Sequence, residues 1–267
     1  MNHLFRELAP LTPAAWREIE GEARRTLRAL LAARQVVDFS GPLGWEVSEV
    51  RSGGALPVPP PLRSPEVQAR LRRIRPLVEM RVPFAVSRAT LDDIDRGARD
   101  PDLDTVTEAA RQIAIAEDRA VFHGYEAANI AGISAARAAQ TVPLGDSHAD
   151  YPAAVAAAMT RLRDDGVEGP FAMVLNEQLY RELAARTDGG YPILSHVQRL
   201  IDGRIVSGPG IDGGLVVSQR GGDYELTVGQ DFSIGYIDHT EDRVALYIEE
   251  SFTFQILNEQ AAIPLDG

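Results

Sequence analysis

Residues 41–65 read GPLGWEVSEVRSGGALPVPPPLRSP, and this stretch decides how the rest of the chain is organised. Proline removes a backbone donor and fixes φ, so a segment this rich in proline and glycine cannot lie inside a compact sheet. The pattern predicts a long extended excursion between the structured segments on either side.

Four arginines, Arg70, Arg72, Arg73 and Arg75, follow the proline-rich stretch. Such a cluster can bind an anion, or it can form ion pairs with another subunit from an extended arm. The chain as a whole is acidic, which favours the ion-pairing interpretation.

Composition excludes several classes of function. The 267 residues carry a net charge of −12, and all 27 basic residues are arginines. The acidic balance argues against general nucleic-acid binding. Without lysine there is no Schiff-base lysine, phosphate-loop lysine or lysine crosslink, and without cysteine there is no disulfide, thiolate metal site or thiol catalysis. No apolar run is long enough for a membrane span and no secretory signal is present, so the chain is expected to be cytosolic.

Helices and strands can be placed on both sides of the excursion. Upstream, Thr12 and Pro13 begin a helix expected to end near Arg34, with an apolar stripe that must dock on something distant in sequence. Downstream we expect a strand at 78–86, a short helix at 91–97 and a long helix at 104–125 capped by Asp104. Further helices are expected at 150–165, 177–185 and 193–202, and strands at 171–175, 204–207, 214–218, 224–228 and 244–256, with a turn at 220–223 joining two of these strands.

No catalytic motif is evident in the sequence. There is no Gly-x-Ser-x-Gly, and Ser195 and His196 are merely neighbours on an expected helix. The five histidines are scattered without metal-ligand spacing, so we expect no metal site. The acidic run at 100–104 resembles the start of a calcium loop, but it lacks the required glycine and glutamate, and helix capping accounts for it better.

Ordered motifs along the whole chain carry a family resemblance. They are Leu8-Ala9-Pro10-Leu11-Thr12, Gly41-Pro42-Leu43-Gly44-Trp45, Arg81 to Phe84, Glu117-Asp118, Gly190-Tyr191-Pro192, Arg220 to Asp223, Gly229 to Asp231, Ser233 to Tyr236 and Glu250 to Phe254. In their order and spacing the chain resembles the encapsulins, shell proteins of bacterial and archaeal nanocompartments.

The resemblance implies an α+β fold of the tailed-bacteriophage major-capsid type, with an N-terminal helix, an extended loop, a peripheral domain with a long spine helix and an α/β axial domain. The corresponding spans are an N-terminal helical arm at 1–40, an extended loop at 41–77, a peripheral domain at 78–130 and 223–267, and an axial domain at 131–222. It further implies a closed icosahedral shell without catalysis of its own, of about sixty copies if the smallest size forms.

The same resemblance assigns candidate site residues. A cargo enzyme, either a dye-decolourising peroxidase or a ferritin-like iron-oxidising protein, would dock its C-terminal peptide on an inner groove formed by Leu27, Leu31, Arg34, Val36, Asp38, Asp231 and Ile234. A fivefold pore for small solutes or iron would be lined by Asp188, Gly189, Gly190, Tyr191 and Pro192. Some relatives bind flavin through a tryptophan near residue 90; Ser87 to Thr90 offer no aromatic ring, so no cofactor is expected.

Two other functions remain open from the sequence. One is a protease or bacteriocin-like hydrolase, a description that relatives have carried, and the missing triad counts against it. The other is a phage capsid protein that packages DNA, which the acidic balance and the absence of a crosslinking lysine disfavour. A neighbouring gene for a cargo protein would favour the shell, and nucleic acid in purified particles would favour the capsid.

Overall fold

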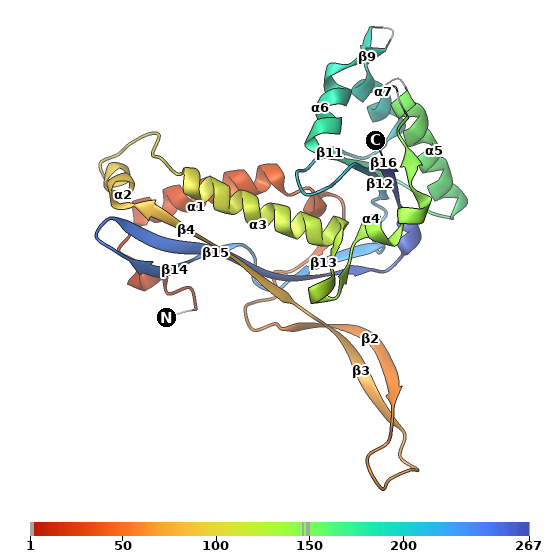
Figure 1. Ribbon diagram of the computed structural model, residues 1–267, viewed down its shortest axis with the longest axis horizontal. Coiled ribbons are helices and arrows are strands. Elements are labelled where there is room, and N and C mark those ends of the chain that lie inside the picture. The colour runs from red at the N-terminus through yellow and green to blue at the C-terminus, as the bar shows by residue number, and fades with distance from the viewer. Residues whose placement is uncertain (1–2, 146, 148–149, 189, 267) are drawn as a thin grey trace.

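Two lobes and a projecting arm make up the molecule (Figure 1). The computed structural model describes residues 3–145, 147, 150–188 and 190–266. One lobe is built on a sheet of long strands, and the other on a more compact sheet flanked by helices. The arm is the proline-rich excursion, which leaves the first lobe as a hairpin.

The first lobe contains what we call the long sheet, with strand order β1-β13-β15-β14 and with β4 paired to β15. Its central strand β15 pairs antiparallel with β4, β13 and β14, while β1 runs parallel to β13. The strands of this sheet are β1 (Asp38–Ser40), β4 (Val78–Ser87), β13 (Tyr224–Val228), β14 (Ser233–His239) and β15 (Arg243–Ile256).

Three helices cover the long sheet on one face. The helices α1 (Pro13–Leu30), α2 (Arg88–Asp95) and α3 (Asp104–Phe122) share one apolar cluster with β4, β14 and β15. The expected Thr12 cap is confirmed, because its hydroxyl accepts a hydrogen bond from the backbone N–H of Ala15 at 3.1 Å. As expected, the apolar stripe of α1 docks on distant sequence, namely α2 and α3 of the same chain.

The second lobe contains what we call the compact sheet, with strand order β11-β8-β12-β16-β7. Its strands are β7 (Val142–Pro143), β8 (Phe171–Leu175), β11 (Ile205–Ser207), β12 (Gly214–Ser218) and β16 (Ala262–Asp266). Its helices are α4 (Ile133–Ala136), α5 (Tyr151–Asp164), α6 (Glu177–Ala185) and α7 (Ile193–Leu200). Every residue of β8 and β12 is buried, which accounts for the apolar sequence of β8 and of all but the last residue of β12, Ser218.

The arm is an antiparallel hairpin of β2 (Glu49–Val58) and β3 (Ala69–Pro76). The predicted excursion is therefore confirmed as a projection from the body, although its two halves pair with each other. Two short strand pairs, β5 (Gly124–Tyr125) with β6 (Ile130–Ala131) and β9 (Thr187–Asp188) with β10 (Tyr191–Pro192), and five 3-10 turns complete the described elements. The turns are Arg6–Leu8, Ala33–Gln35, Glu126–Ala128, Ala138–Gln140 and Glu259–Ala261.

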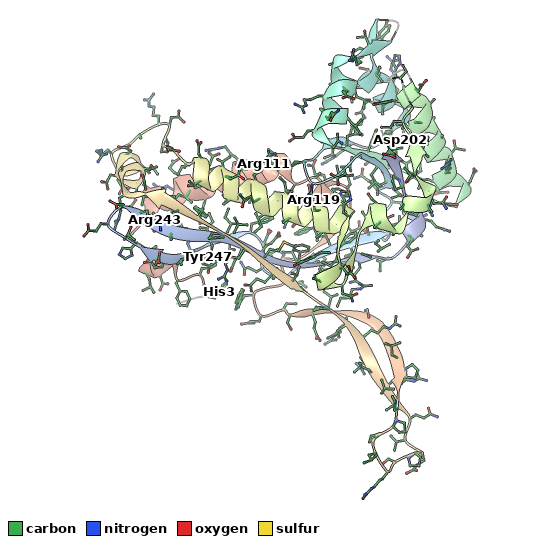
Figure 2. The ribbon with its side chains drawn as sticks, viewed as in Figure 1. His3, Arg111, Arg119, Asp202, Arg243 and Tyr247 are labelled. Carbon is green, nitrogen blue, oxygen red and sulfur yellow. The ribbon has the colours of Figure 1, made fainter. Side chains whose placement is uncertain are left out.

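The N-terminal segment is tied to the edge of the long sheet. The carbonyl of Leu4 accepts a hydrogen bond from Tyr236 N–H at 2.9 Å, and the His3 ring stacks on Trp45 with centroids 3.8 Å apart. His3 Nε2 also lies 2.8 Å from the buried carboxylate of Glu249. The backbone carbonyl of His3 accepts a hydrogen bond from the Tyr247 hydroxyl at 3.4 Å. Figure 2 shows His3 and Tyr247 on the same side of the sheet.

Two elements run through both lobes. The first part of α3 and of β15 belongs to the apolar cluster of the first lobe, whereas Ala120, Val121 and Phe122 of α3 and Phe252 and Phe254 of β15 belong to that of the second. Between these two stretches the same elements carry buried carboxylates, Glu117 and Asp118 on α3 and Glu250 on β15. The boundary between the two cores is therefore polar.

Several details differ from the sequence-based expectations. Helix α1 ends at Leu30 rather than near Arg34, because the chain turns there into a 3-10 turn at Ala33–Gln35. The long helix is not capped by Asp104, which is its first residue; instead the Asp102 carboxylate accepts the Asp104 N–H at 3.2 Å. Strand β14 was not predicted.

Chain connections between the lobes also differ. The turn at 220–223 joins β12 to β13, but these strands lie in different sheets, so it is a crossing between lobes and not a hairpin. The last strand, β16, lies in the compact sheet beside β12, whereas the expected span 223–267 placed it with the long sheet. Local sequence could not show this, because the apolar run of β16 suits either sheet.

Candidate functional site

A groove of about 630 Å³ lies between α1 and the β14 edge of the long sheet. The residues that line it come from three places: the N-terminal turn, α1 with the segment after it, and the strands β14 and β15 with the two residues before β14. They are Arg6, Glu20, Ala23, Arg24, Leu27, Arg28, Leu31, Arg34, Gln35, Asp231, Phe232, Ser233, Ile234 and Ile248.

Apolar side chains form the floor of the groove. Leu27 and Leu31 are four residues apart and face the same side of the helical segment. Opposite them, Ile234 and Ile248 are direct cross-strand partners on β14 and β15. All four are at least nine-tenths buried, so each presents only a small part of its apolar surface to the groove.

Arg34 lines the groove and forms ion pairs with three carboxylates, of which two are buried and the third, Asp231, is 42% exposed. Its Nε donates to both Glu117 carboxylate oxygens at 2.9 Å, and its Nη2 lies 2.5 Å from Glu117 Oε2. Its Nη1 donates to Asp231 at 2.8 Å, and Nη2 also reaches Glu250 at 3.2 Å. The guanidinium also lies 4.4 Å from the ring centroid of Phe232.

The electrostatics of this network are set by burial. Glu117 and Glu250 are fully buried, and Glu250 Oε1 has no hydrogen-bond partner within the described ranges. Burial, with Glu117 as a like-charged neighbour, raises the pKa of Glu250 well above its ordinary value. Burial alone would lower the pKa of Arg34, but Glu117, Glu250 and Asp231 raise it, so the guanidinium stays charged.

Asp118 fixes the segment that leads from α1 to Arg34. Its two carboxylate oxygens accept the backbone N–H groups of Ala32 and Ala33, each at 2.9 Å. Burial raises the pKa of Asp118 to about 7, against the opposing effect of these two hydrogen bonds. The carboxylate therefore takes the place of the helical acceptors that the chain loses where α1 ends.

Five of the residues expected to bind a cargo peptide lie together in this groove: Leu27, Leu31, Arg34, Asp231 and Ile234. Val36 and Asp38 do not line it. Val36 is only 3% exposed and packs in the core of the second lobe. Asp38 accepts a hydrogen bond from Gly222 N–H at 2.6 Å and so holds the turn between the lobes.

Sequence reasoning missed other lining residues, chiefly Arg24, Arg28, Phe232 and Ile248. The two arginines fall at helical spacing with Leu27 and Leu31, which is a signal the sequence carries. Phe232 and Ile248 enter the groove only because β14 and β15 pair beside α1, and no local pattern shows that.

Of the residues expected at a pore, those that the structure describes lie at the tip between α6 and α7. The backbones of Asp188 and Tyr191 pair across the β9–β10 turn, and the Tyr191 side chain is 61% exposed. Gly189 lies outside the described residues. The tip projects from the end of the second lobe, far from the hairpin (Figure 1).

Other chemistry finds little support in the part of the chain that the structure describes. Within it, no three His, Cys, Asp or Glu side chains come together as a metal site would require. Nor is any described helix long and apolar enough to cross a bilayer. Ser87, at the position considered for flavin, caps α2 by accepting the Thr90 N–H at 3.0 Å.

Comparison with known proteins places the chain in a family. A family model described as an encapsulating protein for peroxidase matches residues 1–253. The chain belongs to the encapsulin family. Proteins named type 1 encapsulin shell protein from Rhodospirillum rubrum and Mycobacterium tuberculosis are 53% and 43% identical to it. The two alignments cover 100% and 99% of this chain and 97% and 99% of those proteins.

Solved structures show the same fold at low sequence identity. A virus-like particle from Pyrococcus furiosus aligns with a TM-score of 0.63 at 14% identity, over 94% of this chain and 99% of that one. The capsid of Myoviridae phage XM1 aligns with a TM-score of 0.55 at 11% identity, over 89% and 92%. This encapsulin thus has the α+β fold of tailed-phage capsid proteins, as the sequence resemblance predicted.

Proposed function

We propose that this encapsulin is a shell protein without catalysis of its own, which assembles with itself into a closed icosahedral compartment in the cytoplasm. Relatives that match almost the whole chain are named shell proteins. The observation that carries the proposal is the hairpin, whose exposed apolar side chains are typical of a surface that contacts another protein chain. These are Leu56, Val58, Leu62, Val67, Leu71 and Ile74, with Leu62 91% exposed.

The arginines of the hairpin fit contacts with other copies of this acidic chain. Arg70, Arg72 and Arg73 lie exposed on β3 and, within the described residues, form no ion pair. A neighbouring copy, with its share of the net charge of −12, would supply carboxylates. We therefore propose inter-subunit ion pairing for them rather than binding of a free anion.

Particle mass tests the shell directly. The full chain would be expressed alone and examined by multi-angle light scattering and negative-stain imaging. We expect a uniform hollow particle of about 1.7 MDa, which is about sixty copies of a 29.0 kDa chain. A larger closed particle would refute only the size. A monomer would refute the shell, and co-purified nucleic acid would favour a DNA-packaging capsid instead.

We further propose that the groove beside α1 receives the C-terminal peptide of a cargo enzyme. The family description names a peroxidase, and a ferritin-like iron-oxidising protein is the other candidate. A groove lined by apolar and charged side chains suits an extended peptide, whose alternate side chains fall on one face. Residues 188–192 would line a pore at the fivefold axis, with Asp188 favouring cations such as iron.

Cargo loading is tested by co-expression with a dye-decolourising peroxidase that carries a C-terminal targeting peptide. We expect the intact peroxidase to co-purify with the particle, and a variant without its C-terminal tail to remain outside. In the shell protein, Ile234→Asp should abolish loading by placing a charge in the groove, while Ile237→Asp, at an exposed position on the same strand, should leave loading unchanged. Equal loading of both variants would contradict the groove.

A further inference from the structure

Two arginines on the rim of the groove have no ionic partner among the residues that the structure describes. Arg24, Leu27, Arg28 and Leu31 occur at i, i+3, i+4 and i+7, which makes one continuous stripe along α1 and its end. The leucines of this stripe are buried in the floor, and the arginines are exposed along the edge.

The other charged side chains of the groove are already paired. Arg6 lies 2.5 Å from Glu20, and Arg34 is held by Glu117, Glu250 and Asp231. Across the residues the structure describes, neither Arg24 nor Arg28 forms an ion pair or a hydrogen bond that would neutralise it. In a chain with a net charge of −12, this leaves a local positive site beside an apolar floor.

The pair is also unfavourable by itself, because like charges four residues apart on a helix repel each other. A carboxylate placed between the two guanidinium groups would remove that repulsion and accept charge-assisted hydrogen bonds from both. Glu20 and Asp231 do not serve this purpose, since each is bound to another arginine.

We propose that the segment bound in this groove presents a carboxylate to Arg24 and Arg28, immediately beside its apolar anchors. The inference rests on the proposed function of the groove and specifies the chemistry of its occupant. Leu27 and Leu31 are separated by about 6 Å along the helix axis. In an extended peptide, residues i and i+2 are separated by about 6.8 Å. Two apolar anchors with one residue between them therefore match the spacing of Leu27 and Leu31.

The carboxylate can come from an Asp or Glu side chain or from the C-terminus of the bound segment. Labelled synthetic peptides distinguish these sources, with the full-length protein as the binder. All peptides contain Leu-Gly-Leu followed by one glycine. The first then ends in Asp with an amidated terminus, the second in Asn with an amidated terminus, and the third in Asn with a free terminus. A fourth, with Ser in place of both leucines, controls for the apolar anchors.

Fluorescence anisotropy would measure the dissociation constant of each peptide. We expect the two peptides that carry a carboxylate to bind about three- to tenfold more tightly than the uncharged amide, as a partly exposed double ion pair allows. Arg24→Gln or Arg28→Gln should reduce this advantage and the double variant should abolish it. Arg17→Gln removes an exposed arginine of α1 outside the groove and should leave it unchanged.

The outcomes separate the inference from the proposed function beneath it. Equal affinity of the charged and uncharged leucine peptides, with loss of binding only for the serine peptide, would overturn the carboxylate site and leave the groove intact. If the peptides with a carboxylate still bind more tightly than the uncharged amide to the double variant, the assignment of the site to these two arginines is wrong. Absence of binding by every peptide at millimolar concentration would overturn both.

Discussion

The guanidinium of Arg34 binds the carboxylate of Glu117 through Nε and Nη2, and Glu117 is fully buried at the junction of the two apolar cores. Glu117 lies on α3 between Ala114, in the core of the first lobe, and Ala120, in that of the second. The same guanidinium reaches Glu250, which has the corresponding position on β15. One arginine thus offsets the buried charge of the two elements that connect the lobes.

Arg34→Met should lower the free energy of unfolding by about 3–5 kcal/mol, because it leaves buried carboxylates without a counter-charge. The matched control is Arg96→Met, whose partner Asp93 is exposed, and it should cost less than about 1 kcal/mol. Urea unfolding followed by tryptophan fluorescence measures both. Equal losses in the two variants would mean that the buried network contributes no more to the free energy of unfolding than an exposed ion pair does.

Asp118 predicts a dependence of stability on pH. Its pKa is about 7 in the folded protein and about 4 in an unfolded chain. Between these values the folded state binds a proton that the unfolded state does not, so this group's contribution to the free energy of unfolding falls as pH rises from about 4 to about 7. Above pH 7 the contribution is constant.

The variant Asp118→Asn isolates that contribution. It should be less stable than the wild type at pH 5, since the amide cannot accept from both Ala32 and Ala33, and the deficit should shrink by a few kcal/mol towards pH 8. Urea midpoints at pH 5, 6, 7 and 8 give the difference. Asp93→Asn serves as the exposed control. A deficit that stays constant with pH would contradict the raised pKa.

Two glycines on different elements should respond oppositely to alanine. A Cβ at Gly235 on β14 would lie 2.1 Å from Cζ of Tyr247, so Gly235→Ala must displace that ring and should destabilise the protein by about 1–3 kcal/mol. A Cβ at Gly21 in α1 meets nothing closer than 3.9 Å, so Gly21→Ala should stabilise by up to about 1 kcal/mol. Thermal unfolding of both variants gives their midpoint temperatures. A change of both midpoints in the same direction relative to the wild type would be inconsistent with this packing.

The hairpin should be needed for assembly but not for folding. Replacing residues 51–74 by a short Gly-Ser loop keeps the paired backbones of Val50 and Arg75 at its base. The residues outside the hairpin should keep their far-ultraviolet circular dichroism signal, since the removed segment is mostly exposed. Light scattering should show no closed particle, because the exposed apolar side chains of the hairpin are missing. A milder variant, Leu62→Ser, should weaken assembly without changing monomer stability. Particles from the shortened chain would disprove the role of the hairpin.

Elements with strong local signals could be predicted from the sequence. The bounds of β8, β12, β13 and α6 are those expected, because each has a continuous apolar run or a clear cap with turn residues at its ends. Strand β14 was missed, since its Ser-Ile-Gly-Tyr sequence is short in apolar residues and gains its place by pairing with β15.

For the candidate site, the resemblance to encapsulins supplied five residues that the structure brings into one groove and two, Val36 and Asp38, that it places elsewhere. The helical stripe with Leu27 and Leu31 was visible in the sequence, because a period of 3.6 residues sets one face. That Arg34 is held by buried carboxylates was not visible, since its partners are 83 to 216 positions away.

From the order of its residues alone, this chain has an apolar helical stripe at its N-terminus that needs a distant partner, a proline-rich excursion that cannot lie inside a compact sheet, and an acidic, lysine-free composition. Propensity, periodicity and charge are local properties, and they can be read from neighbouring residues. Which lobe β16 joins, where the buried charges meet and which arginines lack an ionic partner among the described residues follow only from the packing of distant segments. Those outcomes depend on burial and on long-range pairing, which exist only once distant segments have packed together.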